Sequence, residues 1–147
     1  MRNIFKPVLE IRSKAGALHF KRLALWQSKH FNIYIHHILK SDADKHPHEH
    51  PWSFITIPLV GGYVHNVFHP IGDAAHFRTY YYPCKERVVP LCPVQMSPHE
   101  LHRVRLLKPT WSLVLTGPRV NDKWGYLVNG RIMDNEEYRK RKNERTL

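Results

Sequence analysis

The sequence predicts an all-β fold, an antiparallel sandwich or closed barrel, followed by one short C-terminal helix. Segments rich in β-branched and aromatic residues recur at a spacing of roughly 8–12 residues, and turn residues or prolines separate them. Between these segments no stretch has the periodicity of a helix until residue 134. Strands with this spacing and no intervening helices are typical of sandwiches and barrels.

The segments before residue 40 vary in how clearly they predict a strand. Residues 1–17 are mixed and predict at most a terminal strand, with Pro7 and Gly16 as interruptions. Residues 17–26 fit a bulged strand and a short helix equally well, because their apolar residues follow no single period. Residues 31–39 are dense in isoleucine and aromatic residues and predict a strand.

A polar loop at residues 41–45 leads into a histidine cluster and then into further strands. Residues 52–60 predict a strand that ends at Gly61-Gly62, where a bulge is expected before residues 63–67 resume the alternation. A hairpin tip is expected at 70–75, around Ile71-Gly72-Asp73. Further short strands are predicted at 77–82, 87–89, 93–96, 104–107, 111–116 and 123–128.

The last segment, residues 134–143, predicts the helix. Asp134 can cap it, Glu136 and Glu137 fall in its first turn, and basic residues gather at its end, as the helix dipole favours. We therefore expect one domain over residues 1–147, with a barrel core at about 17–130 and a helix at about 134–143.

Composition and charge narrow the class of protein. The chain has 147 residues, and 42% hydrophobic content excludes a largely disordered chain. No apolar stretch is long enough for a membrane span, and no signal peptide is evident, so a cytoplasmic location is expected. The two cysteines, Cys84 and Cys92, are too few for a disulfide scaffold and are expected to be ordinary thiols.

The net charge of +11 raises the hypothesis of nucleic-acid binding, because a basic surface attracts phosphate. The basic residues concentrate at the two ends of the chain, and the tail carries Glu136, Glu137 and Glu144 beside its bases, as on a solvated helix. No compact nucleic-acid-binding motif is present. Nucleic-acid binding therefore stays an alternative without a motif to support it.

The strongest signal for a site is the sequence His46-Pro47-His48-Glu49-His50-Pro51-Trp52. In an extended strand alternate side chains share a face, so the three histidines point one way and Glu49 the other. Clustered histidines with this spacing indicate a metal-binding or catalytic site, whereas single histidines are usually surface or satisfied core residues.

A partner for this cluster lies 52 residues after His50, at His102. If its strand lies beside His48 and His50, three neutral imidazoles meet one ion and leave coordination positions open, which is the catalytic arrangement. Such a set suits Fe(II), Zn, Ni, Cu or Mn. We therefore predict that His48, His50 and His102 bind one divalent transition metal.

Several short motifs then occur in a characteristic order: His48-Glu49-His50-Pro51-Trp52, Gly61-Gly62-Tyr63, His102-Arg103-Val104, Leu115-Thr116-Gly117-Pro118-Arg119 and Trp124-Gly125-Tyr126. Together they resemble a group of small, uncharacterised cupin-like proteins of bacteria and their phages, over residues 31–126. The resemblance implies a double-stranded β-helix (jelly-roll) barrel with a metal held by the His-x-His pair and the later histidine. It leaves the substrate open, because fold does not determine function.

The sequence departs from the general cupin pattern in its ligands. The glutamate expected four or five residues after the second histidine is replaced by Phe54 and Ile55. In the second motif His99 stands for the expected glycine and Leu106 for the expected asparagine. The remaining all-histidine set is similar to that of thiol dioxygenases, which supports an Fe(II) oxygenase hypothesis.

Three further residues are candidates for catalytic roles. Glu100 is a fourth ligand or general base, or else a surface carboxylate. Arg119, like Arg103, could clamp a substrate carboxylate or phosphate, or form a structural ion pair. Tyr63 is a candidate for lining the cavity, although aromatic residues in a small barrel usually serve packing. The same choice applies to His65, Tyr80 and Tyr82.

Several remaining aromatic residues and histidines receive simpler assignments. His46 is an extra ligand, an orienting donor or an exposed residue. We expect three tryptophans to lie in the core: Trp52, Trp111 and Trp124. Four histidines show no pattern that lifts them above surface or satisfied residues: His36, His37, His69 and His76.

Two functions are therefore predicted. The first is a metal-dependent enzyme acting on a small molecule, either an oxygenase with Fe(II) or an isomerase or epimerase with a metal such as Zn or Mn. The alternative is a non-catalytic binding or accessory protein that holds a sugar, peptide or nucleic acid. The resemblance to cupins implies a homodimer formed through sheet edges in either case.

Overall fold

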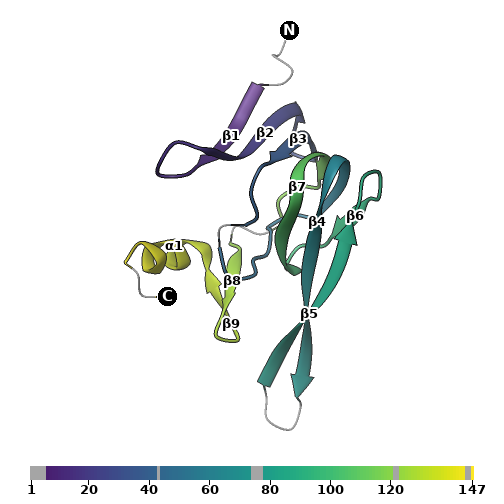
Figure 1. Cartoon of the computed structure of the whole chain (residues 1–147). Coiled ribbons are helices and arrows are strands. Elements are labelled where there is room, and N and C mark those ends of the chain that lie inside the picture. Colours follow the sequence, from purple (N-terminus) through teal and green to yellow (C-terminus); the bar gives the residue numbers. More distant parts are fainter. Residues whose placement is uncertain (1–5, 43, 74–77, 121–122, 145–146) are drawn as a thin grey trace.

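The computed structural model describes residues 6–42, 44–73, 78–120, 123–144 and 147. It is an antiparallel β structure with one short helix, as predicted (Figure 1). The elements in chain order are β1 (Lys6–Arg12), β2 (Leu18–Gln27), β3 (Asn32–Ile38), β4 (Phe54–Asp73), β5 (Arg78–Val88), β6 (Val94–Met96), β7 (Leu101–Thr116), β8 (Gly125–Val128), β9 (Arg131–Asp134) and α1 (Asn135–Asn143).

Two long strands, β4 and β7, run antiparallel to each other and bend together near their middle. The bend lies at Gly61, which has a φ of +95°, and the register of the pair shifts between Pro58 and Tyr63. A Cβ at Gly61 would lie against the carbonyl oxygen of Pro109 and 2.8 Å from the Cα of Thr110. Only glycine allows this close approach and this φ, so Gly61 lets both strands turn from one layer into the other.

Each half of the bent pair belongs to a different layer. The first half of β4 and the second half of β7 continue into β3, β2 and β1 on one side and β6 on the other. The second half of β4 and the first half of β7 continue into β5, and His48 bridges β7 to Tyr126 of β8. Strands that serve two sheets in this way form a jelly roll, which agrees with the predicted fold class.

The structure also corrects several element boundaries. Residues 17–26 form the bulged strand β2, with its register shift between Ala24 and Trp26, so the helical alternative is wrong. The hairpin tip is not at Ile71-Gly72-Asp73, because these residues pair with Tyr80, Thr79 and Arg78. The predicted breaks at 61–62, 83–86 and 108–110 are absent, since β4, β5 and β7 each run through them. The strand β9 was not predicted.

The C-terminal helix α1 is confirmed, together with its cap. The Asp134 carboxylate accepts a hydrogen bond from the backbone N–H of Glu136 at 2.9 Å. Tyr138, which is 2% exposed, stacks on the Tyr126 ring with centroids 3.8 Å apart. Helix α1 lies beside the β8–β9 hairpin (Figure 1), and Tyr138 joins it to a small buried cluster with Tyr126 and Val128.

Trp111 is not in the core, contrary to prediction. Its side chain is 37% exposed and stacks on His37 with ring centroids 4.0 Å apart. Strand alternation gives the reason, since Thr110 and Ser112 on either side are fully buried and take the inner face. Trp52 and Trp124 are both half-buried. In the described part of the chain no helix has the length and hydropathy needed to cross a bilayer.

Candidate metal centre

The histidine cluster lies in an extended loop that is pinned between two strands. His48 forms an antiparallel bridge with His102, with both backbone hydrogen bonds at 2.9 Å. The carbonyls of Pro47 and Pro51 accept hydrogen bonds from Leu127 and Val120, each at 2.9 Å. Because proline lacks an N–H, the loop cannot continue as a regular strand, yet its carbonyls still fix it on both sides. The predicted neighbourhood of the two histidine motifs is confirmed.

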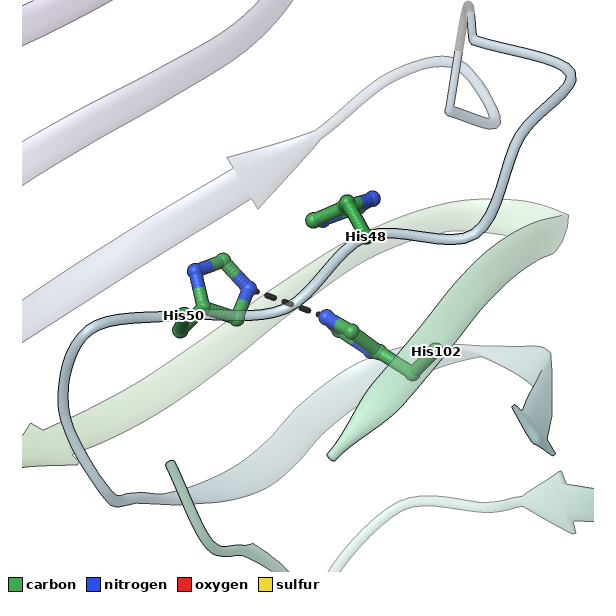
Figure 2. A group of neighbouring side chains, drawn as sticks. All are labelled: His48, His50 and His102. Atoms are coloured by element: carbon green, nitrogen blue, oxygen red, sulfur yellow. Dashed lines mark hydrogen bonds between the residues drawn. The ribbon is translucent and has the colours of Figure 1, made fainter. Parts of the chain in front are cut away.

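The three imidazoles converge (Figure 2). Nε2 of His50 and Nε2 of His102 are 2.9 Å apart, and one ring nitrogen from each of His48, His50 and His102 lies within 4.8 Å of the others. Two nitrogens bound at about 2.0–2.1 Å to one metal ion are separated by roughly 3.0 Å at a right angle. The His50–His102 pair therefore has the separation of adjacent ligands, and His48 brings a third ring nitrogen within 4.8 Å of both.

The protonation of these histidines also suits metal binding. His102 is 5% exposed, and burial lowers its pKa well below the usual range. Burial also lowers the pKa of His50 well below its usual range, and the charges of His48, Arg22 and His36 lower it further. Both rings are therefore neutral near pH 7 and have a lone pair to offer. Nδ1 of His48 is buried and has no hydrogen-bond partner in the described structure, which fits a group reserved for a ligand.

Behind the three histidines lies a fourth, His65. Its Nε2 is 2.8 Å from Nδ1 of His102, and the side chain is 2% exposed. His65 was a candidate for lining the cavity, and the structure places it against His102. When Nδ1–H of His102 donates to His65, Nε2 of His102 presents its lone pair toward His50. His65 thus determines both the tautomer and the orientation of the His102 ring.

Tyr63 lies beside His65 on the inner face of β4. Its ring meets His65 edge-on, with centroids 6.2 Å apart, and the side chain is 3% exposed. Burial raises the pKa of its hydroxyl, and a hydrogen bond with Thr56 partly offsets this. The hydroxyl is therefore protonated at neutral pH.

Aromatic side chains surround His50. Trp52 and Trp124 lie nearly parallel to its ring, at interplanar angles of 22° and 21° and centroid distances of 6.0 and 6.4 Å. Phe54 meets the ring edge-on at 5.2 Å. These rings restrict how His50 can turn and keep much of the site dry, which strengthens electrostatic interactions there.

Two other predicted site residues are Glu100 and Arg119. The Glu100 carboxylate accepts a hydrogen bond from the backbone N–H of Ser97, within its own turn. Arg119 is exposed, in the segment that follows Gly117 and runs beside Pro51 and Ser53. The side chains of Tyr80 and Tyr82 are not among those that the structure describes.

His46 and Glu49 both have structural partners away from the metal ligands. Nδ1 of His46 hydrogen-bonds with the Tyr138 hydroxyl at 3.0 Å, which ties the loop to α1. Glu49, 7% exposed, pairs with His99 at 3.1 Å and points away from its histidine neighbours, as strand alternation predicted.

Sequence reasoning missed three polar residues. Arg22 and His36 face each other across β2 and β3, with Nε of Arg22 donating to Nε2 of His36 at 2.9 Å. Asp42 accepts a hydrogen bond from the Val104 backbone at 2.6 Å and interacts electrostatically with His48. The signal for His36 was the alternation within residues 32–38, in which Tyr34 and His36 share one face while Ile33 and Ile35 share the other.

No family model and no curated protein matches this chain. Several solved structures are similar to it. The Fe(II) form of HppE is similar at a TM-score of 0.53 and 14% identity, over 80% of this chain and 58% of that one. A conserved protein of unknown function from Streptococcus pyogenes is similar at a TM-score of 0.51 and 13% identity, over 68% of this chain and 75% of that one.

These comparisons concern the fold. At identities of 13–14% they show that the chain has the cupin fold. The chain spans 58% of the length of HppE, so it corresponds to only part of that protein.

Proposed function

We propose that this protein is a metal-dependent enzyme that acts on a small molecule through His48, His50 and His102. One observation carries the proposal: three neutral imidazoles from two separate segments of the chain converge, with two ring nitrogens 2.9 Å apart. The similar fold of HppE, a protein solved in its Fe(II) form, supports a metal at such a centre.

The donor set indicates which metals fit. Three neutral nitrogens with no carboxylate suit Fe(II), Zn, Mn or Ni, and an open set of three leaves room for a substrate. A bound metal would supply Lewis acidity or, as Fe(II), a template for O₂ and substrate. Bound Fe(II) would favour an oxygenase, whereas bound Zn, Mn or Ni would favour an isomerase or epimerase.

The protein's own residues prepare the site. His65 holds the His102 ring, and the aromatic residues around His50 exclude water. Tyr63, protonated and two residues from His65, is placed to donate a hydrogen bond or a proton. Glu100 remains a candidate base if its turn opens, and Arg119 a candidate for binding a substrate anion at the rim.

The second candidate function is non-catalytic binding of a sugar, peptide or nucleic acid. The charge of +11 is the observation that favours a nucleic acid. Binding through phosphate contacts weakens steeply as salt rises and does not depend on His48 or His102. A metal-dependent enzyme predicts the opposite pattern, since those two histidines are essential to it.

We further propose a homodimer, although the surface that favours it is a sheet face rather than a sheet edge. Exposed apolar side chains gather on the outer face of the layer formed by β3, β4 and β7, among them Ile55, Trp111 and Leu115. Apolar patches of this kind on a sheet are typical of protein–protein contacts. A second copy of the chain would cover them.

The test of the enzymatic proposal is a metal analysis of protein purified without chelator. We expect close to one transition-metal ion per chain in the parent, and strong loss in His48→Ala and in His102→Ala. His30→Ala, in an exposed turn, is the matched control and should keep the metal. Parent protein that folds but binds none of the four metals would refute the proposal.

A further inference from the structure

Arg22 is a charged residue on the inner face of the jelly roll. It pairs with His36 across β2 and β3, and His36 pairs with Ser112 of β7, so the three share one face. Ser112 is fully buried, and Val114, next on that face, is 4% exposed. An arginine in such a position is uncommon, because the interior disfavours an uncompensated charge.

The contacts of Arg22 fix its guanidinium but leave most of its donors unused. Nε donates to His36, while the group lies over the Tyr34 ring at 4.8 Å from the centroid and near the Phe20 ring at 5.9 Å. Of the five N–H donors of a guanidinium, the four on the terminal nitrogens have no hydrogen-bond partner among the described residues. The stacking and the single hydrogen bond therefore hold these donors ready for a ligand.

No carboxylate of the described chain pairs with Arg22, although the surface ion pairs Glu10–Arg12 and Glu137–Arg141 show that arginines elsewhere have such partners. Burial lowers the pKa of Arg22, but a guanidinium stays protonated in proteins. Half-burying a permanently charged group without a nearby anion costs free energy. A ligand that brings an anion would offset this cost.

The three-histidine centre faces the same interior as this group, because Phe54 of the same layer meets the His50 ring edge-on at 5.2 Å, and the charge of Arg22 helps to lower the pKa of His50. The three imidazoles bring no negative charge, so a bound divalent cation would keep its full charge near a second cation. Without an anion the two charges repel each other. An anionic group between them would be attracted by both.

We propose that Arg22 binds an oxyanion group, a carboxylate or a phosphate, of the small molecule on which the three-histidine centre acts. The planar guanidinium suits two parallel hydrogen bonds to such a group. His36 is a positioning residue that holds Nε and thereby aims the terminal nitrogens. The substrate assignment rests on the proposed function, whereas the anion site itself does not require a metal.

The test is isothermal titration of metal-free protein with inorganic phosphate and, separately, with acetate, at constant ionic strength. We expect the parent to bind at least one of them and Arg22→Gln to bind it at least tenfold more weakly. Arg22→Lys should fall between, because it keeps the charge and loses the planar fork. Arg105→Gln removes an exposed arginine of β7 and should match the parent, which excludes a general effect of charge.

Two further measurements keep the outcome decisive. Circular dichroism and urea titration establish that each variant folds, and if Arg22→Gln does not fold, Arg22→Lys decides the test. Metal content should be equal in the parent and the Arg22 variants. Parent protein that binds neither anion, or Arg22 variants that bind as tightly as the parent, would overturn the anion site. Parent protein that binds an anion but none of the metal ions would instead overturn only the proposed function.

Discussion

The hydrogen bond between His65 and His102 gives the sharpest prediction for the metal centre. The two side chains are 2% and 5% exposed, and their ring nitrogens are 2.8 Å apart. Substitution His65→Leu removes the acceptor that keeps Nε2 of His102 unprotonated and aimed at the metal position. Loss of such an outer partner costs 10–100-fold in metal affinity, about 1.4–2.7 kcal/mol. The variant should also lose about 1–3 kcal/mol of stability, because Nδ1 of His102 becomes a buried donor without a partner.

The assay is competition for the metal against a chelator of known affinity, with urea unfolding of the metal-free protein alongside. His65→Gln is the informative companion, because its side-chain oxygen can accept the same hydrogen bond and should restore part of the affinity. His30→Gln, at an exposed position, controls for loss of a histidine. A folded His65→Leu protein with the metal affinity of the parent would refute the role assigned to His65.

Three further predictions follow from individual contacts. Burial lowers the pKa of His36 to about 3, so below the unfolded-state value of about 6.5 the unfolded chain binds the proton first. The free energy of unfolding of metal-free protein should therefore fall as pH drops, by about 1.6 kcal/mol between pH 6.5 and 5 from this residue. Urea titrations should show a shallower fall in His36→Gln, and an equal one would contradict the assignment. Gly61→Ala should cost about 2 kcal/mol or more in the same assay, through backbone strain and collision with the strand opposite. Gly16 has a φ of +85° with open space around it, so Gly16→Ala measures the backbone strain alone. Equal losses of stability in the two variants would exclude the collision at Gly61. Trp111→Lys should convert a dimer to a monomer in sedimentation velocity, and a parent that is monomeric at all concentrations would exclude the dimer.

The sequence by itself determined much of the local structure, through the types and the spacing of its residues. The density of β-branched and aromatic residues predicted the strands, and Asp134 with its acidic first turn predicted the helix. The spacing of His48 and His50 predicted a shared face, and His102 in the second motif predicted a third imidazole beside them. These properties depend on strand and helix periods, which a sequence displays directly.

The tertiary structure decided which face of each strand looks inward. In β3, Ile33 and Ile35 would be expected inside, yet Tyr34 and His36 take the inner face, opposite Val114 and Ser112. Periodicity separates the two faces of a strand but does not say which one meets the core, since that depends on the register with neighbouring strands. Arg22 and His36 therefore gave no signal as site residues.

Long-range geometry decided the rest. The bend at Gly61 sends β4 from one layer to the other, and this places His65 behind His102, 37 residues away along the chain. A glycine pair in a sequence permits such a bend, but only the close approach of Pro109 and Thr110 requires it. The three histidines proposed to bind a metal could thus be named from their spacing alone. The residues that orient them, and the guanidinium beside them, were determined by how two sheets fold onto each other.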